Sequence, residues 1–158
     1  MRLTTLNVVA MFAGALLAPA GWVSSKAGGE SKQAGRLLTE IKADAEQIRS
    51  CARNLENLAK TPGAKWQEYD QQWNTIKPAQ ERIDLATQRL ESMQASLAPA
   101  EQKVLAQTKR DLEEISSTTH DLWIRLGQPK LDLQALSADA RGLDKAAREL
   151  VNVTASTS

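Results

Sequence analysis

Apolar residues recur at alternating steps of three and four positions from residue 31 to residue 152, and polar residues fill the positions between them. Such spacing places one apolar stripe along one side of an α-helix, so it predicts helices that pack against each other. Proline or glycine interrupts the pattern at residues 61–63, 98–99 and 127–129. Because these residues end helices, the pattern predicts four of them.

The first, third and fourth predicted helices carry continuous stripes. Their members are Leu38, Ile41, Ala45, Ile48, Ala52, Leu55 and Ala59, then Leu105, Thr108, Leu112, Ile115, Thr119, Leu122 and Leu126, then Leu133, Leu136, Ala140, Leu143, Ala147 and Leu150. Short connections make consecutive helices run in opposite directions, so we expect an all-α, antiparallel up-down four-helix bundle with coiled-coil-like packing. A three-helix arrangement with a loose fourth helix is the alternative. Alanine alternates with larger residues in the first and fourth stripes, which predicts that these two helices form the closest pair.

The stripe of the second predicted helix changes phase within WQEYDQQWNTIKP, residues 66–78. The steps alternate between three and four except from Ile76 to Ala79, where a three follows a three. This stammer lies beside Pro78, which lacks a backbone donor and clashes with the carbonyl four residues earlier, on Asn74. We therefore expect the second helix to be kinked at Pro78.

Thr119 in the third helix lies opposite the expected kink. In one arrangement its hydroxyl, or a water held by it, bonds to the freed carbonyl of Asn74. In the other the hydroxyl bonds to the carbonyl of Ile115 in its own helix, as helical threonines often do. The sequence leaves both open.

Four aromatic residues form the candidate ligand or partner surface: Trp66, Tyr69, Trp73 and Trp123. Counting outward from the connection near Ala98 places Trp73 level with Trp123. An aromatic stripe at helical spacing is more simply explained as one end of the core. Trp123 lies just off its stripe, so we expect it to be half-buried.

The ends of the chain predict export. Residues 1–20, MRLTTLNVVAMFAGALLAPA, combine a positive charge, a short apolar run and small residues, which is the order of a secretory signal peptide. The signal peptide could instead be cut after residue 27. The alternative to a cleaved signal peptide is a membrane anchor that is not cleaved. We expect a flexible linker at residues 21–30, the bundle at residues 31–152 and a disordered tail at residues 153–158, in the periplasm or outside a bacterial cell and without membrane insertion after cleavage.

Charge and composition exclude some classes of partner. The chain has 20 Lys and Arg against 19 Asp and Glu, and removal of Arg2 with the signal peptide makes the two counts equal. Such a balance gives no electrostatic reason to bind nucleic acid. There is one cysteine, Cys51, which is either buried or available for pairing with another chain.

Candidate chemistry is sparse. His120 is the single histidine, and its neighbour Asp121 points about 100° away around a helix, so the two do not form a dyad. We expect His120 to face solvent. The sequence has no clustered zinc ligands, no Glu-x-x-His motif and no haem attachment motif, so we expect no catalytic residues, no metal and no cofactor.

These features predict a non-enzymatic exported bundle that binds another protein or serves as a structural module, with self-association left open. Two alternatives remain. One is a periplasmic chaperone or sequestering protein with an exposed apolar groove, and the other is a binder of a small hydrophobic ligand among Trp66, Trp73 and Trp123. The helical pattern identifies no family, because many unrelated bundles share it.

Overall fold

The computed structural model describes residues 21–156, and this part of the chain is all-helical. The elements are α1 (Gly21–Lys60), α2 (Trp66–Ser92), the short 3-10 helix η1 (Gln94–Ser96), α3 (Pro99–Leu126) and α4 (Leu133–Ala155). Within the described residues there is no strand, so the expected all-α class with four helices is confirmed. The predicted signal peptide, residues 1–20, lies outside the described residues.

Each helix after α1 begins at a recognisable local signal. The Glu68 carboxylate accepts a hydrogen bond of 2.6 Å from the Lys65 backbone N–H at the start of α2, and Glu101 accepts one of 2.8 Å from Ala98 before α3. Asp132 accepts a bond of 3.0 Å from the Ala135 N–H at the start of α4. These bonds satisfy backbone groups that a helix end leaves without partners, so the helices begin where the sequence supplies the acceptors.

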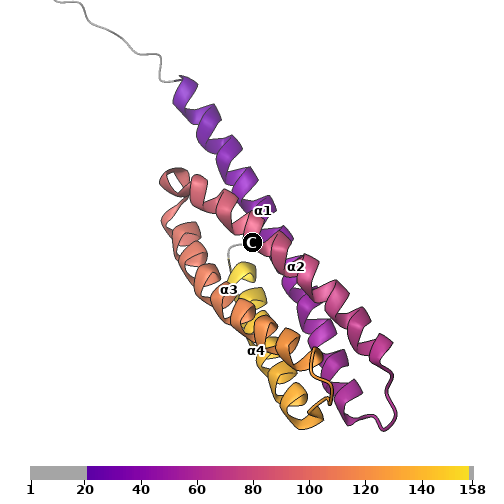
Figure 1. The fold of residues 1–158 in the computed structure, drawn as a ribbon. Helices are drawn as coiled ribbons and strands as arrows, with labels where there is room; N and C mark the ends of the chain where they lie inside the picture. Colours follow the sequence, from indigo (N-terminus) through magenta and orange to yellow (C-terminus); the bar gives the residue numbers. More distant parts are fainter. Residues whose placement is uncertain (1–20, 157–158) are drawn as a thin grey trace, which may run out of the picture.

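The breaks between helices lie where proline and glycine predict them. The α1–α2 loop contains Gly63 with a φ of 78°, a conformation that glycine adopts without steric cost. Pro99 is the first residue of α3, where its missing N–H would have no helical partner. Figure 1 shows the α1–α2 and α3–α4 loops at one end of the molecule and η1 near the other end.

The four helices pack around one core. α1 lies against α2 and α4, and α3 lies against the same two helices. The predicted stripes supply most of this core, including Ile41, Ile76, Ile115 and Leu143, none of which is measurably exposed. α1 and α4 share the most extensive contact of any two helices, and α2 and α3 share the least among the four pairs of neighbouring helices.

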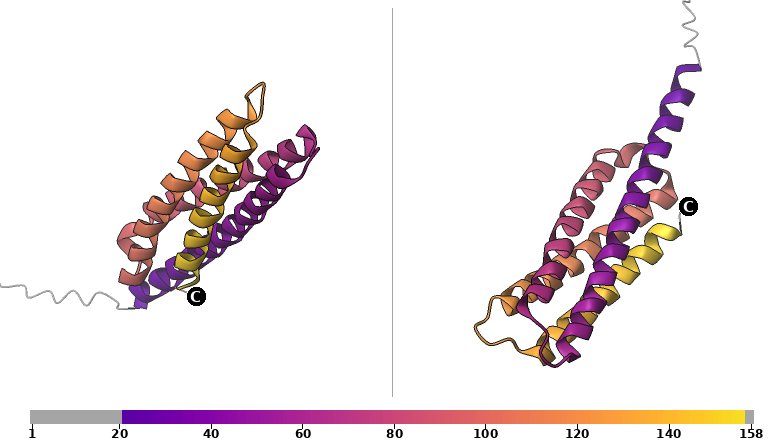
Figure 2. Two further views of the ribbon diagram at one scale, coloured as in Figure 1. Left: turned by 90° about the horizontal axis from the view of Figure 1, so that it is seen from below. Right: turned by 90° about the vertical axis from the view of Figure 1, so that its right-hand side faces the viewer.

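Two parts of the described chain differ from the sequence-based prediction. Residues 21–30, expected as a flexible linker, belong to α1, which extends past the other helices in Figure 2. Once a helix is formed, each added residue contributes another hydrogen bond without a new nucleation cost.

The C-terminal segment also continues a helix. α4 runs to Ala155, whereas a disordered tail was expected from residue 153. Val151 and Thr154 are buried, and the Thr154 hydroxyl donates to the Leu150 carbonyl at 2.9 Å. Threonine thus continues the buried stripe, because a bond to its own helix satisfies its polar group.

Candidate functional site

The sparse contact between α2 and α3 leaves an open hollow between them. Its volume is about 320 Å³. Residues from both helices line it: Trp73, Lys77, Gln80, Glu81, Ser116, Thr119, His120 and Trp123. A hollow of this size with aromatic and polar walls has the general character of a binding site.

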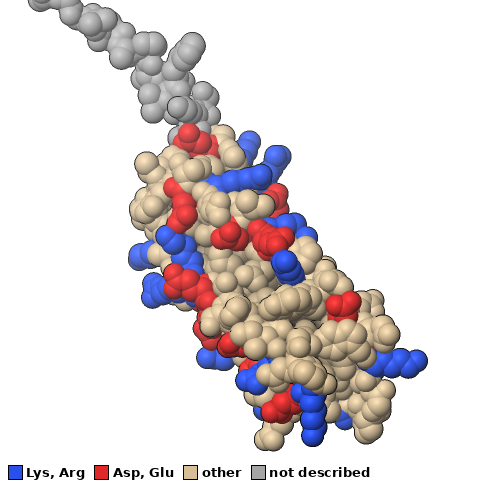
Figure 3. Space-filling view, in the orientation of Figure 1, with Lys and Arg blue, Asp and Glu red and all other residues tan. Residues whose placement is uncertain are grey.

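A second hollow, of about 240 Å³, continues along the same pair of helices. Its lining residues are Asp84, Thr87, Gln88, Glu91, Lys109, Leu112, Glu113 and Ser116. Ser116 lines both hollows, so they adjoin, and together they are called here the α2/α3 groove. Figure 3 shows the corresponding face, on which an uncharged area is bordered by side chains of both signs.

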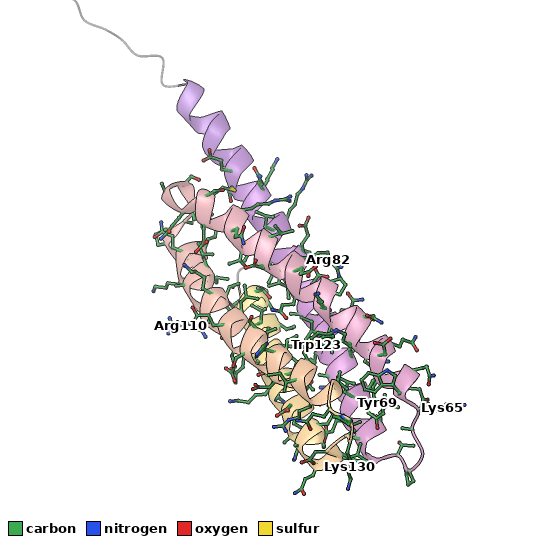
Figure 4. All side chains as sticks on the ribbon, viewed as in Figure 1. Lys65, Tyr69, Arg82, Arg110, Trp123 and Lys130 are labelled. Carbon is green, nitrogen blue, oxygen red and sulfur yellow. The ribbon has the colours of Figure 1, made fainter. Side chains whose placement is uncertain are left out.

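Two tryptophans form one end of the α2/α3 groove. The rings of Trp73 and Trp123 are stacked, with their centroids 5.2 Å apart and an angle of 28° between the planes. This contact confirms the prediction that the two residues lie at the same level. Trp73 is 9% exposed and Trp123 is 55% exposed, so Trp73 supports a ring that faces solvent on its other side. Figure 4 shows Trp123 between α2 and α3.

The middle of the groove contains a polar contact between the helices. The Gln80 side-chain amide donates a hydrogen bond of 3.2 Å to the Ser116 hydroxyl oxygen. His120 is exposed and lines the same hollow one helical turn from Ser116. Sequence reasoning did not single out Ser116, although its spacing of four residues from His120 places both on one face of a helix. No hydrogen bond joins the two side chains within the described structure, so the geometry of an activated nucleophile is not present here.

Thr119 does not bond to the carbonyl that Pro78 frees. Its hydroxyl donates to the Ile115 carbonyl at 2.7 Å. A threonine hydroxyl has one hydrogen, so the same group cannot also donate to Asn74. The bond within the helix is therefore confirmed, and a direct bond from the Thr119 hydroxyl to the Asn74 carbonyl is wrong.

The four candidate aromatic residues do not form one surface. Tyr69 is 3% exposed, and its hydroxyl donates to the Leu58 carbonyl at 2.9 Å, near the α1–α2 loop. Burial, followed by the nearby charge of Glu68, raises the pKa of Tyr69 above its ordinary value. Trp66 is 49% exposed and lies outside the α2/α3 groove. Trp66 therefore does not join Trp73 and Trp123 at the groove.

The single cysteine is buried. Cys51 forms no disulfide and is 7% exposed. Burial raises the pKa of the Cys51 thiol, and a hydrogen bond with Thr75 partly offsets this effect. A buried neutral thiol acts mainly as a small apolar side chain, as the first of the two interpretations expected.

Two buried polar groups were not predicted as special. The hydroxyl of Thr108 and one carboxylate oxygen of Asp111, Oδ2, have no hydrogen-bond partner among the described residues. The other oxygen of Asp111 accepts a bond of 2.7 Å from Gln107. Desolvation raises the pKa of Asp111, the Gln107 bond opposes this, and the charges of Glu149 and Glu114 add to the increase.

Comparisons with family models, curated proteins and solved structures find no match to this chain. Between residues 21 and 156, no three acidic, histidine or cysteine side chains come close enough together to hold a metal ion. None of the helices in the described part of the chain has the length and apolar character needed to cross a membrane. The function is therefore inferred from the physical features of the α2/α3 groove.

Proposed function

We propose that this chain is an exported, non-enzymatic helical bundle that binds another protein through the α2/α3 groove. The observation that carries the proposal is Trp123, a large aromatic side chain that is 55% exposed beside a hollow and supported from below by Trp73. Tryptophan is enriched among the residues that dominate protein interfaces, because it contributes a large rigid surface. Such an interface requires no catalytic group.

Export is supported by the order of charge, apolar residues and small residues in residues 1–20. The protein then acts in the periplasm or outside the cell, after cleavage behind residue 20 or residue 27. Mass spectrometry of the chain purified from its native compartment tests this point. A mass that includes residues 1–20 would contradict it.

The finer architecture that we propose is an antiparallel up-down bundle with coiled-coil-like packing and α2 kinked at Pro78. Two side-chain hydrogen bonds between α1 and α2 support opposite directions for these helices. Arg82 bonds to Asp44, and Gln72, which precedes Arg82 in α2, bonds to Asn54, which follows Asp44 in α1. The kink is supported by the position of Pro78 inside α2 and by the sparse contact between α2 and α3. A bend in α2 would help to keep the groove open.

The test of the binding function compares two exposed tryptophans. Trp123→Ser removes the aromatic surface of the groove, whereas Trp66→Ser removes a ring of similar exposure, 49%, outside the groove. Each tagged variant is expressed in the source organism, and the proteins that co-purify are quantified against the wild type. We expect Trp123→Ser to lose at least one partner about tenfold and Trp66→Ser to retain it. Equal recovery with both variants would contradict binding through the groove.

A chaperone or sequestering role is the second candidate, and the same exposed Trp123 favours it. A chaperone would hold many unfolded chains, whereas a specific module would hold few partners. Light scattering of an aggregating client separates the two, because only the chaperone role predicts suppression that Trp123→Ser abolishes. The small-ligand alternative has weaker support, since the hollow beside Trp73 and Trp123 is open and does not include Trp66.

A further inference from the structure

The charged residues along the α2/α3 groove are divided unevenly between the two signs. Two lysines line it, against four carboxylates: Glu81, Asp84, Glu91 and Glu113. The chain as a whole has a formal net charge of +1, so the groove is more acidic than the average of the chain. A partner that brings positive charge would fit this surface better than one that brings negative charge.

Three of the four carboxylates are available to a partner. Lys109 is paired with Glu91 and also attracts Glu113 at longer range. Glu81, Asp84 and Glu113 form no direct ion pair in the part of the chain that the structure describes. All three are exposed. Asp84 accepts only a bond of 2.9 Å from Gln88, one turn further along the same helix. The free carboxylates come from both walls of the groove, two from α2 and one from α3.

The dimensions of the groove fit a helix. From Lys109 to Trp123 along α3 the rise is about 21 Å, which corresponds to a helical segment of about 15 residues. The walls are two helices with no strand edge between them, so the groove offers no backbone groups for an added strand. An amphipathic helix in a groove between helices is a known mode of peptide recognition.

Apolar contacts lie where such a helix would place its apolar face. Trp123 forms one end of the groove, and Leu112, partly buried against the core, lies towards the other. These residues would contribute most of the affinity, because ion pairs between exposed groups stabilise only weakly. The carboxylates would instead determine which helices bind and how fast they associate.

We propose that the α2/α3 groove binds a basic amphipathic helix of another protein. Its apolar face packs on Trp123 and Leu112, and lysines or arginines on its flanks meet Glu81, Asp84 and Glu113. This inference rests on the proposed function, for which it specifies the chemical class of the partner.

Two synthetic peptides of about 15 residues test the inference. Both carry leucines at helical positions i, i+3, i+4 and i+7, and their flanking positions are all lysine in one and all glutamate in the other. Binding of each labelled peptide to the full chain is followed by fluorescence anisotropy at low salt. We expect the lysine peptide to bind about tenfold more tightly than the glutamate peptide, and the difference to shrink at about 0.5 M salt.

Matched variants locate the effect. The triple variant Glu81→Gln, Asp84→Asn and Glu113→Gln should bring the two peptides to within about threefold of each other, since it removes the free carboxylates. The control triple variant neutralises exposed carboxylates outside the groove, and it should keep the preference of the wild type. Its substitutions are Glu46→Gln, Glu114→Gln and Asp121→Asn. Circular dichroism confirms that both variants keep their helical content.

The outcomes distinguish this inference from the proposed function. Equal binding of the two peptides, or a preference that survives in the groove variant, would overturn the basic partner. Failure of both peptides to bind would also overturn it. In each case the Trp123→Ser co-purification still decides independently whether the groove binds a protein.

Discussion

At the scale of single residues, Asp111 is the least expected feature of the molecule. It is 3% exposed, and Oδ2 has no hydrogen-bond partner within the described residues. No cation forms a direct ion pair with it in the described part of the chain. Glu149 and Glu114 contribute further negative charge, which Arg110 offsets only in part. A buried carboxylate in this position opposes folding when it is ionised.

The raised pKa of Asp111 predicts a dependence of stability on pH. The unfolded chain loses this proton near pH 4, whereas the folded chain retains it to higher pH. Above the pKa of Asp111 in the unfolded state, the unfolded state therefore binds fewer protons than the folded state. As the pH rises from this value to the pKa of Asp111 in the folded state, the difference lowers the free energy of unfolding. Asp111→Asn should remove this decrease and so raise the free energy of unfolding at pH 7.

Urea unfolding at pH 4 and pH 7 measures the effect. Asp121→Asn, an exposed position on the same helix, is the control and should leave the pH dependence as it is in the wild type. If Asp111→Asn lowers stability at pH 7, the carboxylate has a partner that stabilises the folded state, and this account of Asp111 is incorrect.

The sequence predicted correctly the positions that follow from counting residues along a helix. Trp73 and Trp123 meet because the helices on both sides of the connection near Ala98 have regular rise, so equal distances from it lie at equal levels. Asp111 could not be found in this way. It lies next to the apolar stripe, where a carboxylate normally faces solvent, so its burial does not follow from the pattern.

At the scale of helices, Pro78 is the main departure from regular structure. It lies inside α2, which continues from Trp66 to Ser92 without interruption. An interior proline removes one hydrogen bond and strains the preceding turn, at a cost of about 3 kcal/mol. Pro78→Ala should therefore raise the free energy of unfolding, by up to that amount, because it restores a donor to the Asn74 carbonyl.

Pro99→Ala is the matched control for this substitution. Pro99 is the first residue of α3, where proline has no cost, so its replacement should not stabilise the protein. Both variants are compared with the wild type by urea unfolding. Equal or lower stability of Pro78→Ala would show that the folded state depends on the proline at this position.

The sequence predicted the existence of the helices better than their extent. Proline and glycine mark the three connections chemically, so these were found. The first turns of α1 contain Gly28 and Gly29 and no apolar stripe, and therefore they were expected to be a linker. The end of α4 was missed because Thr154 occupies a buried position that sequence patterns assign to apolar residues.

At the scale of the whole molecule, unequal packing of the four helices creates the candidate site. α1 and α4 share the most extensive contact, and the alanines of their stripes predict that this pair also has the smallest interaxial distance. The chaperone alternative expected an exposed apolar groove, but the sequence did not predict that it would lie between α2 and α3 or that carboxylates would line it. That separation depends on the positions of all four helices together, which no single stripe determines.

The central claim is that the α2/α3 groove, and not another face of the bundle, contacts the partner. The most direct measurement introduces a photo-crosslinking residue at Ser116, which lines both hollows, or at Ser117, which is exposed but points about 100° away around α3. Each variant is irradiated in the source organism, and crosslinked products are identified by mass spectrometry. The account predicts a discrete crosslinked protein from position 116 and none from position 117. The same product from both positions, or a product from position 117 alone, would contradict it.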